Sequence, residues 1–499
     1  MLVMSACGAG SSKTSSGVAS SQSNTFVVAQ SADAVTLDPH KTNDSASANV
    51  MNQIYDRLVK LNKDMKIEPE LAKSWKQINS TTWQINLQHG VKFSNGEELK
   101  ASDVKFTFDR LLDPKTASPG AFVLAPVNQV KVIDDYTVQI ITKKPFAPIL
   151  YNLSHTATSI INQKAVESEG KQYGQKPVGT GPFTFVSWEK SSNIVLKKNK
   201  DYFGGAPKLD EIKFRIIPDT ETQVAELRTG GVDAVLTLSA DSLAQLQSAK
   251  NVTINKVPAF SVKYLGFDER TKPFNDVRVR QAINYAINKE ALIKAAYNGT
   301  AVPEKGPLAP GVNGYDENAQ GYPYDLAKAK KLLAEAGYPN GFSTTIYVSN
   351  QAPDPKIATI IQSQLGQVGI KVNQQVMEWG AFLDKTAKGV PMFLLGWITV
   401  TGDADNGLYA NFNSANFGGP GNRQFYKNPK VDQLLNDAQA ETDPSKRQQE
   451  YVQAQEQIVK DAPWAFLAVP QNIVAINKRV QGFVNMPTQN YYFQNVSVK

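Results

Sequence analysis

The sequence contains few of the residues from which metal and disulfide sites are built. Its 499 residues include one cysteine, Cys7, and three histidines, His40, His89 and His155. A single thiol can form neither an internal disulfide nor a cysteine-based metal cluster. No histidine has a second histidine or the cysteine at the spacing of a helical metal site. We therefore expect no bound metal and no cofactor.

The common catalytic motifs are also missing. The sequence has neither a Walker phosphate loop nor a Gly-x-Ser-x-Gly nucleophile elbow. Gly179-Thr-Gly181 lacks the third glycine of a dinucleotide loop, and Pro182 after it predicts a tight turn into a strand. The nearest candidates for a paired-carboxylate hydrolase are Asp403 and Asp405, which at this spacing are more typical of a turn or a polar pocket rim. We therefore predict that the protein is not an enzyme, with a hydrolase as a remote alternative.

Dense basic blocks and long apolar runs are absent as well. The formal net charge is +7 and the sequence pI is about 9.0, but the lysines and arginines are dispersed. Nucleic-acid binding needs a clustered basic surface, so we expect no nucleic-acid partner. No run reaches the roughly 18 apolar residues of a transmembrane helix. The length instead suggests two to four folding units of about 100–200 residues each.

The amino-terminal residues resemble the processing site of a bacterial lipoprotein. Small residues Ser5 and Ala6 precede Cys7, and the following stretch to residue 23 is mostly Ser, Gly, Thr, Ala and Gln. Such a composition buries too little apolar surface to fold and predicts a flexible tether. We expect lipid on Cys7 to anchor the protein to the membrane, and residues 1–23 to be a truncated signal remnant and tether. The alternative is a cytosolic protein with a chance cysteine.

The remaining chain alternates strand-like and helix-like segments. Short β-branched runs predict strands at 183–188, 194–197, 212–217, 232–236 and 252–257, with helices at 221–228 and 242–248 between them. Apolar residues at helical spacing predict further helices at 51–61, after Asp276, after Asp325 and from Pro355. This alternation predicts an α/β fold.

An ordered set of short motifs resembles the bacterial extracellular solute-binding proteins of family 5, the receptors of peptide and nickel importers. The motifs span roughly residues 24–485, and each is modest alone while the ordered set is specific. They are Leu37-Asp-Pro-His40, Ile54-Tyr-Asp-Arg-Leu58, Glu68-Pro-Glu-Leu-Ala72, Gly90-Val-Lys-Phe93, Ala101-Ser-Asp-Val-Lys-Phe-Thr-Phe108, Val178-Gly-Thr-Gly-Pro-Phe183, Pro273-Phe-Asn-Asp-Val-Arg-Val-Arg-Gln-Ala-Ile-Asn-Tyr-Ala286, Ala327-Lys-Ala-Lys-Lys-Leu-Leu333, Gly396-Trp397 and Asp461-Ala-Pro-Trp464. The segment from Gly396 to Tyr426 is most similar to the dipeptide and glutathione receptors of that family.

The resemblance implies a two-lobe periplasmic-binding-protein-like α/β fold, of type II with an extra inserted domain, and a ligand cleft between the lobes. Lobe I would comprise residues 24–56, 174–265 and 472–499, and the inserted domain residues 57–173. Lobe II would comprise residues 266–471. Hinges would lie near Val262–Asp268 and Pro470–Ile473.

The resemblance also implies a function. The protein would be the substrate-binding lipoprotein of an ABC importer, a monomer held at the cell surface or in the periplasm by lipid on Cys7. It would capture a peptide-type solute, namely a dipeptide, glutathione or a short oligopeptide. It would then deliver the solute to membrane permease and ATPase subunits.

The same motifs suggest ligand-binding residues. The family pattern places an acid for the peptide amine near Val400, where this chain has none, so Asp403 or Asp405 would supply it. Arg423 would pair with a ligand carboxylate, because a guanidinium binds a carboxylate through two hydrogen bonds. Trp397 would stack on the ligand. The polar candidates are Thr399, Thr401, Tyr409, Asn422, Thr42, Asn43 and Asp44, of which the last three are equally typical of a helix N-cap.

Two other readings of the same fold stay open. An oligosaccharide ligand would stack on Trp397 and Trp379 without charge pairing. A metal chelate is less favoured, because His155 has no arginine beside it in the sequence. A receptor with a chaperone-like or sensory role is a further alternative.

Overall fold

The structure is a computed structural model that describes residues 24–499 except 239, 247 and 420. Cys7 and the rest of the expected tether, residues 1–23, lie outside the described residues. Within the described part of the chain, no helix combines the length and the hydropathy needed to cross a bilayer.

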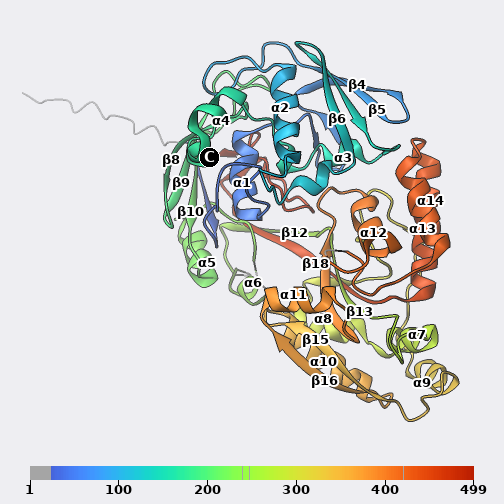
Figure 1. Cartoon of the computed structure of the whole chain (residues 1–499). Helices are drawn as coiled ribbons and strands as arrows, with labels where there is room; N and C mark the ends of the chain where they lie inside the picture. Colours follow the sequence, from blue (N-terminus) through green and yellow to red (C-terminus); the bar gives the residue numbers. More distant parts are fainter. Residues whose placement is uncertain (1–23, 239, 247, 420) are drawn as a thin grey trace, which may run out of the picture.

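One sheet of twelve strands runs through the molecule (Figure 1). Its path is β16-β15-β17-β13-β18-β11-β1-β10-β9-β8, with β12 and β14 also paired to β18. The strands are β1 (Thr25–Gln30), β8 (Phe183–Glu189), β9 (Asn193–Lys198), β10 (Glu211–Ile216), β11 (Ala234–Val235), β12 (Val252–Pro258), β13 (Ser261–Phe267), β14 (Ala301–Pro303), β15 (Ser343–Ser349), β16 (Lys371–Met377), β17 (Met392–Ile398) and β18 (Trp464–Asn477).

The sheet has two halves that share only β18. We call the half built from β1 and β8–β12 lobe I and the half built from β13–β17 lobe II. The first part of β18 pairs with β13 and β14 in lobe II, and its second part, from Gln471, pairs with β12 in lobe I. The chain crosses between the halves at residues 258–261, from β12 to β13, and again at 470–471 within β18. The prediction of an α/β fold is confirmed, and both crossings lie at or beside the expected hinges.

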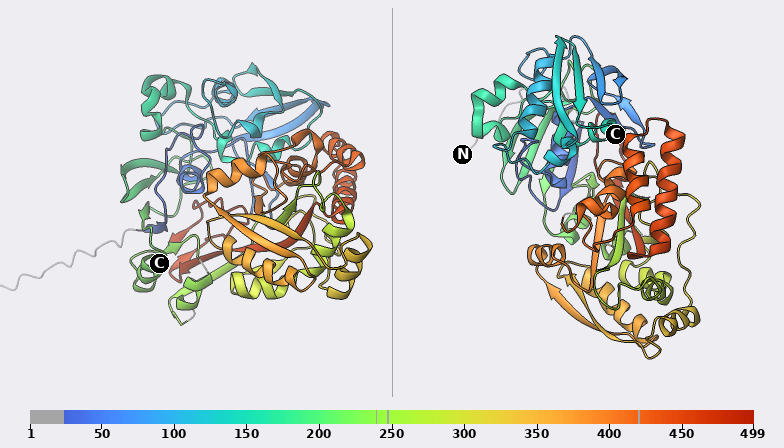
Figure 2. Two further views of the ribbon diagram at one scale, coloured as in Figure 1. Left: turned by 60° about the horizontal axis from the view of Figure 1, so that its bottom comes forward. Right: turned by 45° about the vertical axis from the view of Figure 1, so that its right-hand side comes forward.

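Helices cover both halves (Figures 1 and 2). The helices outside lobe II are α1 (Ser45–Ile54), α2 (Ala101–Leu112), α3 (Ile149–Asn152), α4 (Gln163–Glu169), α5 (Thr220–Thr229) and α6 (Ala240–Leu246). Those of lobe II are α7 (Val277–Ala286), α8 (Lys289–Tyr297), α9 (Leu326–Glu335), α10 (Asp354–Gly366), α11 (Trp379–Ala387), α12 (Ala404–Phe412), α13 (Pro429–Ala440) and α14 (Pro444–Asp461). Most begin at an acid or amide that accepts a backbone hydrogen bond, as Asp276 does for α7 and Asp325 for α9.

A separate four-stranded antiparallel sheet lies within residues 57–173, beside lobe I. Its order is β4-β5-β7-β6, formed by β4 (Ala72–Asn79), β5 (Thr82–Leu87), β6 (Val127–Asp134) and β7 (Thr137–Thr142). A hairpin of β2 (Val59–Leu61) and β3 (Ile67–Pro69) precedes it, and β19 (Val480–Gln481) pairs with β20 (Ser497–Val498) near the carboxyl terminus. The exact domain boundaries given above stay a prediction.

The helix predicted at 51–61 is wrong in its position. The helix, α1, covers Ser45–Ile54, and the chain then turns into strand β2. Asp44 starts the helix early by accepting a hydrogen bond from the Ser47 N–H. The helix ends because the Arg57 backbone N–H and guanidinium both bind Glu70, which holds the next residues extended. Leu58 and Leu61 extend the apolar spacing of the helix but lie outside it. Leu61 belongs to β2 and Leu58 directly precedes that strand, and both are buried.

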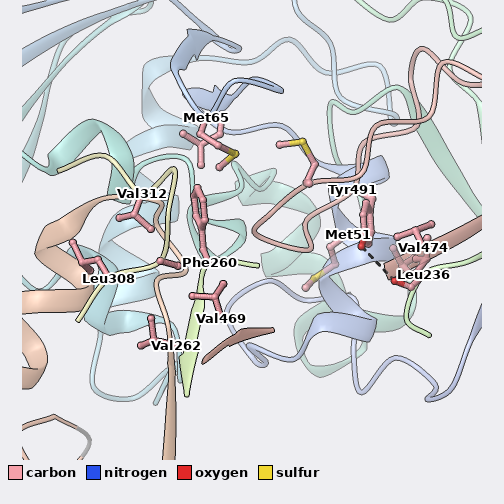
Figure 3. Close-up of a cluster of buried hydrophobic side chains, with 14 of the residues drawn as sticks. Met51, Met65, Leu236, Phe260, Val262, Leu308, Val312, Val469, Val474 and Tyr491 are labelled. Carbon is pink, nitrogen blue, oxygen red and sulfur yellow. Dashed lines mark hydrogen bonds between the residues drawn. The ribbon is translucent and has the colours of Figure 1, made fainter. Parts of the chain in front are cut away.

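An apolar cluster packs against the two crossings (Figure 3). Phe260, in the first crossing, is 1% exposed and lies between Met65 of the β2–β3 turn and Val262 and Val469. A Cβ placed on Gly402 would lie 3.5 Å from Phe260 Cε2 and 3.3 Å from Leu61 Cδ1. The turn, the crossing and a lobe II loop therefore pack against one another at the hinge.

Replacing Phe260 by alanine is expected to destabilise the protein by about 3–5 kcal/mol, because the cavity it leaves is surrounded by both lobes. Urea unfolding followed by tryptophan fluorescence measures the change. Phe260→Leu should cost less, and Val186→Ala, at a 53% exposed position on β8, should cost under about 0.5 kcal/mol. Equal losses for Phe260→Ala and Val186→Ala would contradict this role.

Candidate ligand site between the lobes

A cavity of about 250 Å³ lies between the two lobes at the crossings. Lobe I elements, both crossings, lobe II strands and the carboxyl-terminal segment all contribute to its wall. We call this cavity the slot. Its lining residues are Thr42, Asn43, Asp44, Ser45, Ala48, Met51, His155, Thr156, Ala157, Ala259, Phe260, Ser261, Ile398, Val400, Pro470, Gln471, Pro487, Thr488, Gln489 and Asn490. Its volume lies near the lower end of the roughly 300–1,000 Å³ usual for ligand pockets, which suits a small solute.

The amino-terminal end of α1 forms one wall of the slot. Asp44 caps the helix: its carboxylate accepts hydrogen bonds from the Ser47 N–H at 2.8 Å and the Ser47 hydroxyl at 2.6 Å. The Thr42 hydroxyl donates to the same carboxylate. Asn43 between them is exposed. The expected Thr42, Asn43 and Asp44 therefore all lie at the slot, and the N-cap role is confirmed for Asp44.

His155 contributes a neutral imidazole to the same wall. Its Nδ1 accepts a hydrogen bond from the Ala157 N–H at 3.1 Å, so the proton of the neutral ring is on Nε2. Burial, assisted by the nearby positive charge of Arg57, lowers the pKa of His155 to about 4. The ring also meets Phe122 edge-on, with centroids 5.9 Å apart. At neutral pH the slot therefore contains an uncharged imidazole.

The lobe II wall consists of the paired ends of β13 and β17. Ser261 lies opposite Ile398 in the strand pairing, and both line the slot together with Val400. Thr399 and Thr401 flank Val400 in the chain and are both buried, and the Thr399 N–H donates to the Phe260 carbonyl at 2.8 Å. Neither threonine is among the lining residues of the slot.

The other residues expected after Gly396 lie away from the slot. Trp397 donates its indole N–H to the Asn406 carbonyl at 3.0 Å. Tyr409 lies under the Lys144 ammonium, 5.6 Å from the ring centroid. Asn422 is fully buried and donates to the carbonyls of Asn413 and Tyr426, which holds the loop after α12.

Arg423 is buried at 6% exposure on the same loop. Its guanidinium donates to the Leu383 carbonyl at 2.5 Å and to the Thr386 hydroxyl at 2.7 Å, both on α11. Burial lowers the pKa of Arg423, since none of these partners carries a charge. The contacts attach the loop to α11, and Arg423 is not among the residues that line the slot.

Asp403 is part of a buried ion pair. Its two carboxylate oxygens accept hydrogen bonds from Arg447 at 2.6 and 2.8 Å, and one also accepts from the Asn313 amide at 2.8 Å. It caps α12 as well, by accepting from the Asp405 N–H at 3.0 Å. Asp403 is fully buried, and these partners occupy its carboxylate.

Asp405 accepts a hydrogen bond from the Gln439 amide at 2.8 Å on α13. Burial raises its pKa to about 6, and the negative charge of Asp403 adds to the effect. Neither aspartate lines the slot, so neither faces a solute there. Their arrangement stabilises the α12–α13–α14 packing and offers no pair of carboxylates to the slot.

Sequence reasoning missed several slot residues: His155, Ala259, Gln471 and the segment Pro487–Asn490. Their common feature is position, since they lie at the crossings or pack beside them although they are far apart in the sequence. The only available signal was the return of the chain to lobe I after residue 470. Among the described residues, no cluster of three or more His, Cys, Asp or Glu side chains could hold a metal ion.

Breaking the Asp403–Arg447 pair should be costly. Arg447→Met leaves a buried carboxylate without its counter-ion, and we expect a loss of about 3–5 kcal/mol in urea unfolding. The double variant Arg447→Met/Asp403→Leu should recover much of it. Arg215→Met removes a partly exposed pair with Glu226 and should cost under about 1 kcal/mol. An Arg447→Met protein as stable as the wild type would contradict the structural role.

The raised pKa of Asp405 predicts that the stability of the protein depends on pH. Because its pKa in the folded protein is raised to about 6 from 3.8, folding disfavours the ionised form. The penalty is absent below about pH 4, grows between pH 4 and pH 6, and persists above. Asp405→Asn should therefore be more stable than the wild type by on the order of 1 kcal/mol at pH 7.5, with a smaller difference at pH 4.5. Urea unfolding at both values measures it, and an unchanged difference would contradict the assignment.

Known proteins are similar to this chain over most of its length. The sequence model of the protein family "Bacterial extracellular solute-binding proteins, family 5 Middle" matches residues 66–419. The glutathione-binding protein GsiB of Pectobacterium atrosepticum is 36% identical over 482 residues, covering 95% of this chain and 94% of that protein.

Two solved structures extend the likeness to three dimensions. HbpA2 of Haemophilus parasuis matches with a TM-score of 0.89 at 31% identity, covering 95% of this chain and 100% of that one. The periplasmic binding protein DppA of Helicobacter pylori, in complex with the peptide STSA, matches with a TM-score of 0.80 at 34% identity, over 95% and 98% of the chains. The two-lobe solute-binding fold is thereby confirmed. The chain belongs to the bacterial extracellular solute-binding proteins of family 5.

Proposed function

We propose that this protein is the receptor of an ABC importer and that it captures a peptide-type solute in the slot. The class covers dipeptides, glutathione and short oligopeptides. The observation that carries the proposal is the position of the slot, which is lined by both lobes and by both crossings of the chain. A solute there touches both lobes at once, so its binding energy favours the closed arrangement.

The chemistry of the slot supports an amide-rich solute. Asn43, Gln471, Gln489 and Asn490 supply side-chain amides, and the His155 Nε2–H is a fixed neutral donor. Peptide N–H and C=O groups can pair with such donors and acceptors once closure removes water. The names of the relatives agree with this class, since they bind glutathione in one case and the peptide STSA in another.

The other ligand and activity classes find less support. Trp397 and Trp379, the expected stacking platforms for an oligosaccharide, are not among the slot residues; Phe260 and His155 are the aromatic rings there. A hydrolase built on Asp403 and Asp405 would need carboxylates that face the solute, and Arg447 and Gln439 occupy these two. Solute capture without chemical change therefore accounts best for the site.

The proposal includes the partners and the location of the protein. The closed receptor, a monomer, would dock outside the cytoplasmic membrane on the permease of an importer that also has ATPase subunits. Lipid on Cys7 would hold it at the cell surface or in the periplasm, through acyl chains that contribute about 0.8 kcal/mol per buried methylene. Mass spectrometry of the mature protein tests the lipid, and sedimentation tests the oligomeric state.

Isothermal calorimetry of the full chain with dipeptides, glutathione and tetrapeptides tests the binding itself. We expect affinity for at least one class and a smaller radius of gyration by small-angle scattering when the solute is present. Absence of heat and of any thermal shift across the panel would refute the peptide proposal.

Filling the slot should abolish binding without unfolding the protein. Asn43 is exposed at the slot wall, so Asn43→Trp places a large ring in the cavity and should lower affinity at least 100-fold. Ser80→Trp adds the same ring at the exposed β4–β5 turn and should bind like the wild type. Thermal melts verify that both variants are folded. Full affinity in Asn43→Trp would place the solute elsewhere.

A further inference from the structure

The slot itself offers no obvious partner for the carboxylate of a peptide. Among its described lining residues, the ionisable side chains are Asp44 and His155. Asp44 is an acid whose oxygens already accept hydrogen bonds from Ser47 and Thr42, and His155 is neutral at pH 7. A free peptide or glutathione carries at least one carboxylate, and burying it without a counter-ion is costly. A cation close to the slot is therefore needed.

Lys263 is the basic residue that the strand register places next to the slot. Ser261 and Ile398 are paired and both line the slot, and Lys263 follows two residues later on the same face of β13. Its partner on β17 is Gly396, which has no side chain, and its partner on β18 is Ala468. A Cβ at Gly396 would lie 3.8 Å from Lys263 Cδ, so the lysine stem lies beside the glycine, which presents no side chain to it.

The Lys263 ammonium is held by a carboxylate at the start of α10. Its Nζ pairs with one oxygen of Asp354, and the other oxygen of Asp354 accepts a hydrogen bond from the Ser349 hydroxyl at 2.9 Å. The two side chains are 14% and 7% exposed. Burial lowers the pKa of Lys263, and the negative charge and hydrogen bond of Asp354 oppose that shift. An ammonium has three N–H donors, and this pair leaves donors for a second anion.

Arg423, the carboxylate partner suggested by the sequence, is less well placed. Its guanidinium is directed to α11 through Leu383 and Thr386, and it is not a slot residue. Lys263 instead lies on β13, the strand whose first residue, Ser261, lines the slot.

We propose that Lys263 is the specificity-determining residue that binds the carboxylate of the solute, with Asp354 as its resident partner in the empty receptor. This inference rests on the proposed capture of a peptide-type solute and narrows that class to solutes with a free carboxylate. When the solute enters, its carboxylate joins or replaces Asp354 at the ammonium. The pair thus keeps the lysine charged and in position until a solute arrives.

The test compares each acid with its neutral twin. Calorimetry measures alanyl-leucine against alanyl-leucine amide, and glutathione against its diethyl ester, on the full chain. The wild type should bind the acids at least 10-fold more tightly than their twins. Lys263→Gln should remove that preference by weakening the acids at least 10-fold, equal to about 1.4 kcal/mol, while the neutral twins keep their affinity.

Three variants separate binding from structural support. Lys263→Arg keeps the charge and should keep the preference, even if Lys263→Gln folds poorly. Asp354→Asn removes the resident partner, and the solute carboxylate then serves as the anion that pairs with the ammonium, so the preference should persist. Lys289→Gln alters another buried lysine of lobe II, which donates to the Glu304 carbonyl, and should leave the preference unchanged.

The outcomes distinguish the two proposals. If the wild type binds acids and neutral twins equally, or if Lys263→Gln weakens both to the same extent, the role of Lys263 is refuted while peptide capture stands. Loss of the preference in Lys289→Gln as well would also refute it. If the wild type binds none of the four compounds nor any other peptide, the proposed function fails and this inference fails with it.

Discussion

The pairing of one strand with two halves of a sheet is the constraint on which the rest of the structure depends. Strand β18 is bonded to β13 and β14 through its first residues and to β12 through its last ones. With the β12–β13 connection, it leaves two backbone crossings between the lobes. Any rotation of one lobe against the other is absorbed there, next to Phe260 and Gln471. The slot lies at the same place, so a solute acts on the part of the chain where closure occurs.

The distribution of charge follows from this arrangement. Two aspartates that the sequence suggested for the site are occupied by neighbours: Asp44 by the first turn of α1, and Asp403 by Arg447. Such partners make buried carboxylates tolerable and fix the segments that carry them. The slot is left with neutral amides, hydroxyls and an uncharged imidazole. The pair formed by Lys263 and Asp354, one step along β13, is the charged group most directly continuous with its wall.

Sequence reasoning and structure agree where the signal is local. Alternating strands and helices gave the α/β class, and Asp276, Asp325 and Asp44 were recognisable as helix caps. The prediction of a helix at 51–61 is wrong because apolar residues three or four positions apart occur both in a helix and in a helix that ends and is followed by a buried strand. Here the helix ends at Ile54. The decisive interaction there, Arg57 with Glu70, joins residues 13 positions apart on the two sides of the β2–β3 hairpin. Asp403 shows the same limit, because its partner Arg447 lies 44 residues away.

The sequence by itself determined the family and the α/β class, because ordered motifs and hydrophobic periodicity are properties of contiguous residues. It also pointed to the start of α1 as part of the site. Only the tertiary structure decided which side chains line the slot. Strand pairing places Ser261 and Gln471 there, and His155 and Asn490 come from loops far away in the sequence. Contacts with α14 and α11 occupy Asp403 and Arg423, and strand pairing sets Lys263 beside the slot. Side-chain direction in a strand depends on register, and register is fixed by partners that a linear sequence does not name.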